Sequence, residues 1–224
     1  MKKNTLSPAP KIKIFTDFDG TITEIDSLNM VLDEFAVSDW RPIEDKVTSH
    51  EISEKEALQA EFDLVNTSLN DAIEFLNKNA IIDPTFKKFA EWCKSNSIEL
   101  IVLSGGFREF IHPIFNKFGI NNLEIHSNSL NVNNNSWKVV QSELPKINYL
   151  CNHCKTNHLV EARRQGFKTV YIGDGNTDRC PAENADIIFA KNSLADYLRN
   201  KNKKFYEYQN FNEIQKILIT MPSL

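Results

Sequence analysis

The sequence predicts an α/β protein built on a doubly wound parallel sheet, with a small helical domain inserted after the first strand. Short apolar runs of strand length alternate with stretches of helical periodicity, which is typical of a parallel sheet that carries helices on both faces. The exception is residues 26–82, where apolar side chains recur at helical spacing and no strand signal interrupts them. A chain of 224 residues is long enough to bury a full core together with such an insertion.

Each strand is expected where apolar and β-branched residues run together and end at a small or acidic residue. Leu100–Leu103 stops at Ser104, and Thr169–Ile172 stops at Gly173. The expected strands are 12–16, 98–103, 123–127, 168–172, 186–189 and 204–207. The helices expected between and after them are 84–96, 107–118, 155–165, 178–184, 193–200 and 211–219.

The insertion is expected to be helical because its apolar residues are three and four positions apart. They include Leu28, Val31, Leu32, Phe35, Ala57, Leu58, Phe62 and Val65. We therefore assign residues 1–25 and 83–224 to the α/β core and residues 26–82 to the helical domain.

The first strand leads directly into two carboxylates, Asp17 and Asp19, followed by Gly20. Residues two apart in an extended chain share a face, so both side chains are expected at the carboxyl end of this strand, where open α/β sheets bind ligands. Two close carboxylates repel each other, which indicates that they hold a cation or divide nucleophilic and acid–base roles. Taken alone, this stretch could also be a strand followed by a polar turn without a functional role, since Asp-Gly favours turns.

Two further strand ends carry polar groups beside glycines. They are Ser104-Gly105-Gly106 and the run from Gly173 to Asp178, and Lys155 lies ahead of the second of them. In order and spacing, these motifs resemble those of the haloacid dehalogenase-like (HAD-like) phosphatase superfamily, from about Ile12 to the helix near Asn200. The resemblance implies a Rossmann-like core, and it identifies the helical insertion as the superfamily's cap over the active site.

The resemblance also implies a Mg²⁺-dependent phosphatase. Asp17 would be the nucleophile, with its second oxygen on Mg²⁺, and Asp19 would be the general acid and base, with its backbone carbonyl on the metal. Lys155 would balance the charge between Asp17 and the transferring phosphoryl group. Asp174 would bind Mg²⁺, and Asp178, one turn later, would either bind it or hold one of its water ligands.

Three groups are expected to hold the phosphate. Thr21 offers a hydroxyl, Ser104 offers another, and Gly105 offers a backbone N–H close to the start of a helix, where an anion is favoured. A serine ahead of a helix is also a common N-cap, which is the structural alternative for Ser104.

The first motif and the Cys154-Lys155 junction are similar to the methionine-salvage branch of the family, which acts on 2-hydroxy-3-keto-5-methylthiopentenyl-1-phosphate. Phosphoserine and phosphoethanolamine or phosphocholine are the alternative substrates. Asp26 could hold a substrate ammonium, but the insertion offers only Arg41 for a substrate carboxylate, in a position that does not suit this role. An uncharged tail is therefore expected to be preferred over phosphoserine.

Two segments near the site allow other interpretations. Residues 128–148 contain the polar run Asn131–Ser136 and are expected to form a hairpin or loop near the mouth of the site. The pair Cys151 and Cys154, with His153 between them, could begin a zinc site, but a structural zinc site needs four ligands and no second pair exists. A reduced pair that shapes the turn before Lys155 is the favoured interpretation.

Composition excludes several classes of partner. A net charge of −4 without a basic stripe argues against nucleic acid, and no apolar run approaches the length of a membrane span. The start of the chain has no apolar segment typical of a secretory signal, so reduced thiols and a cytoplasmic location are expected. The expected partner is a small phosphorylated metabolite, and the oligomeric state is open. The non-enzyme alternative is a phosphoacceptor signalling domain, which would lack both the insertion and the second aspartate.

Overall fold

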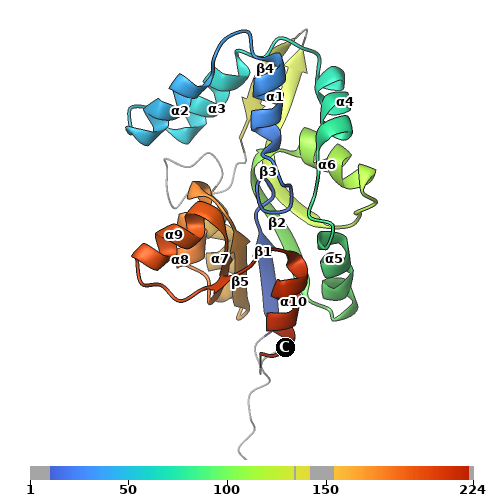
Figure 1. Ribbon diagram of the computed structural model, residues 1–224, viewed down its shortest axis with the longest axis vertical. Helices are drawn as coiled ribbons and strands as arrows, with labels where there is room; N and C mark the ends of the chain where they lie inside the picture. Colours follow the sequence, from blue (N-terminus) through green and yellow to red (C-terminus); the bar gives the residue numbers. More distant parts are fainter. Residues whose placement is uncertain (1–10, 134, 142–153, 222–224) are drawn as a thin grey trace, which may run out of the picture.

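The fold is a seven-stranded sheet with helices on both faces, seen in a computed structural model that describes residues 11–133, 135–141 and 154–221 (Figure 1). The strand order is β4-β3-β2-β1-β5-β6-β7, and all neighbouring strands are parallel except β3 and β4. The strands are β1 (Ile12–Thr16), β2 (Glu99–Phe107), β3 (Glu124–Asn133), β4 (Ser136–Val140), β5 (Lys168–Gly173), β6 (Ile187–Ala190) and β7 (Tyr206–Glu207). The chain leaves β1 toward β2 on one side and returns to its other side at β5. This change of direction creates a ligand-binding edge at the carboxyl ends of the strands.

Alternating side chains in the central strands divide the core into two layers. Ile14 of β1 joins one apolar cluster and Phe15 joins the other, and Val170 and Tyr171 of β5 divide in the same way. Because successive residues of a strand point to opposite faces, both faces must be covered.

The helices that supply this cover lie on opposite sides of the sheet (Figure 1). The first layer contains α5 (Phe86–Ser95), α6 (Arg108–Lys117) and α10 (Phe211–Ile219), and the second contains α7 (Lys155–Arg164), α8 (Arg179–Glu183) and α9 (Asn192–Asn200). The doubly wound architecture predicted from the sequence is confirmed.

Four helices fill the segment between β1 and α5. They are α1 (Ser27–Phe35), α2 (Arg41–Thr48), α3 (Glu54–Phe62) and α4 (Leu69–Asn79), and together they form the helical insertion. Side chains of Asp26, Ser53 and Ser68 accept hydrogen bonds from backbone N–H groups at the starts of α1, α3 and α4. The two ends of the insertion meet in an antiparallel bridge between Thr23 and Ile82. The division at residues 26–82 stays a prediction, since the largest apolar cluster runs from the insertion into the sheet.

The segment after β3 folds back as an antiparallel hairpin with β4, as expected for 128–141, while residues 142–148 lie outside the described part of the chain. The hairpin packs on the insertion rather than extending a flat sheet. Trp137 is buried and its ring nitrogen donates to the backbone oxygen of Thr67 at 3.0 Å. Gln59 of α3 donates to the Trp137 carbonyl and accepts from the Val139 N–H, both at 2.9 Å.

Two strand ends lie more than two residues beyond the prediction, while other boundaries differ by one or two residues. Strand β2 does not stop at residue 103 but continues through the glycines to Phe107, with a shift in its pairing to β3 between Leu103 and Phe107. Strand β3 runs to Asn133 instead of 127 because β4 gives its second half a partner. Glycine weakened the strand signal in the first case, and the polar composition hid it in the second.

Candidate active site

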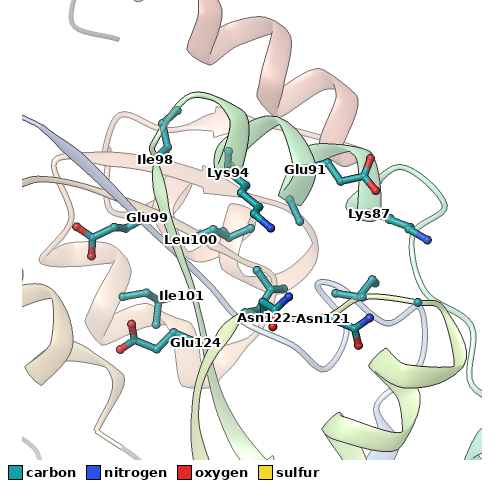
Figure 2. A pocket seen from close by; sticks show the side chains of 15 residues that line it. Lys87, Glu91, Lys94, Ile98, Glu99, Leu100, Ile101, Asn121, Asn122 and Glu124 are labelled. Carbon is teal, nitrogen blue, oxygen red and sulfur yellow. The ribbon is translucent and has the colours of Figure 1, made fainter.

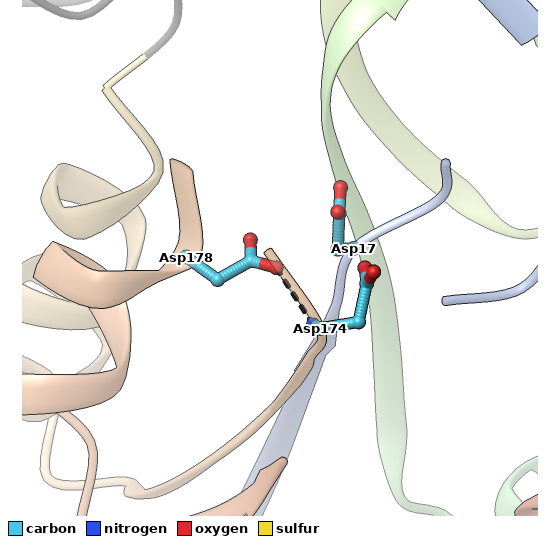
Figure 3. A group of neighbouring side chains, drawn as sticks. All are labelled: Asp17, Asp174 and Asp178. Carbon is cyan, nitrogen blue, oxygen red and sulfur yellow. Dashed lines mark hydrogen bonds between the residues drawn. The ribbon is translucent and has the colours of Figure 1, made fainter. Parts of the chain in front are cut away.

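Three aspartates converge at the carboxyl ends of the neighbouring strands β1 and β5 (Figure 3). Asp17 follows β1, and its N–H donates to the backbone oxygen of Ile172 at 2.9 Å, so it stays in register with β5. Asp174 follows β5, and Asp178 ends the short 3₁₀ turn Asn176–Asp178. One carboxylate oxygen from each residue lies within 4.8 Å of the other two. Such a group of anions requires a neutralising cation.

Lys155 supplies part of that charge from the first position of α7. Its Nζ donates to Asp17 Oδ1 at 2.6 Å and to Asp178 Oδ1 at 2.7 Å, and its side chain is only 3% exposed. Burial alone would lower the pKa of Lys155, but the two carboxylates raise it well above its usual value. The ammonium group is therefore charged wherever the site is folded.

Asp178 is held by four hydrogen bonds. Besides Lys155, its Oδ1 accepts from the Tyr171 hydroxyl at 2.5 Å, and its Oδ2 accepts from the N–H groups of Asp174 at 2.9 Å and Gly175 at 3.1 Å. Burial opposes ionisation, yet these partners, Lys155 first among them, lower the pKa of Asp178. All its acceptor positions are used, which suits a carboxylate that orients its neighbours.

Asp174 and Asp17 accept fewer side-chain hydrogen bonds than Asp178 does. Thr21 donates to Asp174 Oδ1 at 2.8 Å, and Asn192 lies 3.4 Å from Oδ2. Burial and then the charge of Asp178 raise the pKa of both Asp174 and Asp17. Gly20 makes this approach possible, since it has φ +75° and an added Cβ would lie 2.6 Å from Asp174 Oδ2.

Asp19 points to a different set of groups. Its Oδ1 accepts from Ser27 twice, from the N–H at 2.8 Å and from the hydroxyl at 2.6 Å, and Ser104 lies 3.5 Å from its Oδ2. Burial raises the pKa of Asp19, and the two bonds from Ser27 offset part of this rise. Asp19 and Asp17 thus have separate hydrogen-bond partners.

The expected phosphate-binding groups lie beside this pair. The Ser104 hydroxyl accepts from the N–H of Gly106 at 2.8 Å, and the carbonyl of Gly105 accepts from the side chain of Asn128 at 2.8 Å. Ser104 is not the N-cap of α6, because Phe107 occupies that position. The strand carries Ser104 into the site.

Asp26 is brought close to Asp19 through Ser27, the residue that follows it. Its Oδ1 caps α1 by accepting from the N–H groups of Leu28 at 2.8 Å and Asn29 at 3.0 Å. Burial and the charge of Asp19 raise the pKa of Asp26 to about 7.

Ser27, Tyr171 and Asn128 were not anticipated as site residues. A serine behind an aspartate at the start of a helical pattern is a cap signature, and it could have drawn attention to Ser27. Nothing in a strand sequence distinguishes a tyrosine whose hydroxyl reaches a buried carboxylate.

The donor set fits a small divalent cation. Carboxylate oxygens are hard ligands, which such an ion prefers. Lys155 donates to Oδ1 of Asp17 and not to its Oδ2. Each carboxylate oxygen of Asp174 accepts one hydrogen bond, and the bond to Oδ2 is long. Among the described residues, this is the group of acidic, histidine and cysteine side chains close enough to share an ion. Cys151 and His153 lie outside the described residues, while Cys154 is buried.

A hollow in the surface lies away from these groups. It has a volume of about 440 Å³ and lies between α5 and the starts of β2 and β3, with Lys87, Lys94 and Glu124 among its lining residues (Figure 2). The amino ends of parallel strands are opposite the edge that carries the aspartates. None of the expected site residues lines this hollow.

No helix in the described parts of the chain is both long and apolar enough to cross a membrane.

Comparisons with known proteins agree with the arrangement of these groups. Residues 14–183 match the family described as haloacid dehalogenase-like hydrolase. The chain is 33% identical over 223 residues to Pdp3-interacting factor 1 of Schizosaccharomyces pombe, covering 93% of this chain and 95% of that protein. It is 30% identical over 213 residues to 2-hydroxy-3-keto-5-methylthiopentenyl-1-phosphate phosphatase of Brevibacillus brevis, with the same coverage.

A solved structure of phosphoserine phosphatase with a phospho-aspartyl intermediate analogue shares the fold. Its TM-score is 0.71 at 20% identity, and the match covers 93% of this chain and 99% of that one. Together with the motifs at the ends of β1, β2 and β5, these matches show that the chain belongs to the haloacid dehalogenase-like hydrolase family.

Proposed function

We propose that this protein is a Mg²⁺-dependent phosphatase that hydrolyses a small phosphorylated metabolite through a phosphoaspartate formed on Asp17. That it is a phosphoric monoester hydrolase follows from its family and its phosphatase relatives. The proposed Mg²⁺ dependence and the phosphoaspartate on Asp17 are supported by one observation. Lys155 bridges Asp17 and Asp178 beside Asp174, at the carboxyl edge of the sheet.

The first half of the reaction forms the phosphoaspartate. A carboxylate oxygen of Asp17 attacks phosphorus, and the bond from phosphorus to the ester oxygen breaks. Asp19 gives its proton to the departing alkoxide, which leaves as the alcohol. Ser27 fixes the Asp19 carboxyl for this transfer by bonding one of its oxygens twice.

The second half releases phosphate. Asp19 takes a proton from water as the water oxygen attacks phosphorus, the bond to Asp17 breaks, and orthophosphate leaves. Asp17 recovers its carboxylate and Asp19 its proton, so the cycle is closed.

The charge of the phosphate is balanced by groups around Asp17. Lys155 holds Asp17 Oδ1, which leaves the other oxygen of this carboxylate for the reaction or for a cation. Mg²⁺ held by Asp17, Asp174 and the backbone carbonyl of Asp19 would neutralise charge on the phosphoryl oxygens, with Asp178 orienting the surrounding groups. Thr21, Ser104 and Gly105 are the groups proposed to contact the phosphate.

Among phosphorylated metabolites, we propose 2-hydroxy-3-keto-5-methylthiopentenyl-1-phosphate as the substrate, on the basis of the similarity to the Brevibacillus brevis phosphatase. Phosphoserine, phosphoethanolamine and phosphocholine are the alternatives. Arg41 does not favour phosphoserine, since it is exposed and paired with Asp33 at 2.8 Å and Asp39 at 3.2 Å. Hydrolysis of a panel of these phosphates by the purified protein with Mg²⁺ tests the proposal.

Asp19→Asn is expected to slow alkyl phosphates by about 10²–10⁴-fold, and p-nitrophenyl phosphate far less. Alkoxides need a proton to leave, whereas p-nitrophenolate departs without one. The measurement is kcat for both substrate types in the variant and the wild type. Equal losses would contradict the role of Asp19 as the general acid.

Removal of divalent cations is expected to abolish hydrolysis, and Ca²⁺ is expected to inhibit the Mg²⁺-loaded protein. Three carboxylates in a small space suit a small octahedral ion, while calcium has looser coordination and can take both oxygens of one carboxylate. Initial rates after exhaustive chelation, and after titration with each ion, measure this. Full activity in the chelated protein would refute a metal requirement.

A further inference from the structure

Gly106 leaves a small space between three groups of the site. Its φ is outside the left-handed region, so the backbone at this position does not require glycine. A Cβ added there would lie 3.0 Å from Asp19 Oδ2, 3.1 Å from Ser104 Oγ and 3.6 Å from Leu28 Cδ2. Any larger residue would therefore fill the space and press on both oxygens.

The carboxyl oxygen of Asp19 that borders this space is its Oδ2. The other oxygen, Oδ1, accepts two hydrogen bonds from Ser27, at 2.6 and 2.8 Å. Oδ2 lies 3.5 Å from the hydroxyl oxygen of Ser104, which is itself held by the N–H of Gly106 at 2.8 Å. In the reaction proposed above, the proton that Asp19 gives to the leaving group is therefore carried on Oδ2, facing the space.

The leaving oxygen of a phosphate ester fits the position of the missing Cβ. This oxygen is the atom that belongs to both the phosphate and the alcohol, so it has to lie within hydrogen-bond reach of the general acid and beside a phosphate-binding group. The space over Gly106 meets both conditions, since it is within hydrogen-bond distance of Asp19 Oδ2 and of Ser104 Oγ.

Leu28 closes the space on the side of the helical insertion. It lies in the first turn of α1, is partly buried, and packs against the largest apolar cluster. Its N–H donates to Asp26 Oδ1 at 2.8 Å, which fixes this turn of the helix. With an oxygen over Gly106, the Leu28 side chain is already at van der Waals contact. It therefore limits what the carbon bonded to that oxygen can carry.

We propose that Gly106 and Leu28 select phosphate esters with an unbranched ester carbon. The leaving oxygen occupies the space over Gly106, and Leu28 leaves room for an ester carbon that carries one further carbon but not two. This inference rests on the proposed phosphatase function and adds the class of alcohol that the site accepts. The reaction itself is unchanged: the bond from phosphorus to the ester oxygen breaks, and that oxygen takes the proton of Asp19.

Two isomeric esters isolate the branching. They are n-propyl phosphate and isopropyl phosphate, which have the same composition and differ only at the ester carbon. With Mg²⁺, kcat/KM of the wild type is expected to be at least about tenfold higher for n-propyl phosphate, the lower end of what one misplaced carbon costs in a packed site. The readout is the ratio of the two values.

Leu28→Ala removes the side chain that sets this limit. It is expected to bring the ratio down to about two, by raising kcat/KM for isopropyl phosphate relative to the unbranched isomer. A purely structural role of Leu28 would lower both values alike and leave the ratio unchanged.

The matched control is Leu69→Ala, at a leucine that is likewise partly buried in the first turn of a helix of the insertion, here α4. Its ratio is expected to equal that of the wild type. Should Leu28→Ala not fold, Leu28→Val, which also lacks the δ carbons, decides.

The failures are distinguishable through p-nitrophenyl phosphate, whose leaving group departs without a proton and need not lie beside Asp19. If the wild type hydrolyses neither this ester nor the two propyl phosphates, the proposed function fails and the selection with it. If it hydrolyses p-nitrophenyl phosphate but not n-propyl phosphate faster than isopropyl phosphate, or if the Leu28 variants keep the wild-type ratio, this inference alone is overturned.

Discussion

Asp17→Asn is expected to lower kcat by on the order of 10⁴-fold or more and to leave the fold intact. An amide oxygen is a poor nucleophile, so no phosphoaspartate forms. The fold should persist because Asp17 is buried beside Asp178 and Asp174, and removing its charge reduces their repulsion. Lys155 keeps Asp178 as its partner.

Phosphate release in the steady state and thermal melting measure the two parts of this prediction. Asp45→Asn, on an exposed position of α2, is the matched control and should keep both activity and melting temperature. Hydrolysis by Asp17→Asn at a rate comparable to the wild type would contradict the covalent mechanism.

Lys155→Met is expected to lower the free energy of unfolding by about 3–5 kcal/mol, as well as to abolish activity. The substitution leaves the carboxylates of Asp17 and Asp178 buried, at 5% and 0% exposure, without their shared cation. Breaking a buried pair by removing one partner is costly because the remaining charge is uncompensated.

Urea denaturation without divalent cations measures this loss. Lys203→Met, at an exposed position, is the control, and its free energy of unfolding should change by no more than about 0.5 kcal/mol. A loss for Lys155→Met as small as that of the control would show that Lys155 is not the main counter-charge of the site.

The sequence predicted the sheet and the edge that carries the site because both depend on local patterns. Asp17 and Asp174 directly follow apolar runs, and the parallel pairing of β1 with β5 brings the two side chains together. Lys155 could be placed only by resemblance, since a lone lysine ahead of a helix has no local signature of burial. Its contacts with Asp17 and Asp178 come from the packing of α7 on the sheet.

Glu61 shows why other parts could not be predicted. The helical pattern was recognised from Leu58, Phe62 and Val65, and a glutamate between such positions is normally exposed. Its side chain is buried in the folded protein, where α2 and β4 pack against α3, and a pattern within one helix does not encode this packing. The extension of β2 through Gly105 to Phe107 likewise depends on pairing with β3 and on the hydrogen bond from Asn128.

The hydrogen bonds of Gln59 to the β3–β4 hairpin constrain how the helical insertion can move. The insertion joins the core through its two chain ends, which meet at the bridge between Thr23 and Ile82, and the hairpin adds a separate attachment that is continuous with the sheet. Because it is held at the hairpin as well, the insertion cannot swing freely about the bridge alone. We therefore expect the insertion and the hairpin to move together, so that the space above the aspartates has a width set by the sheet itself. Selection among substrates then falls to individual side chains rather than to a closing motion of the insertion.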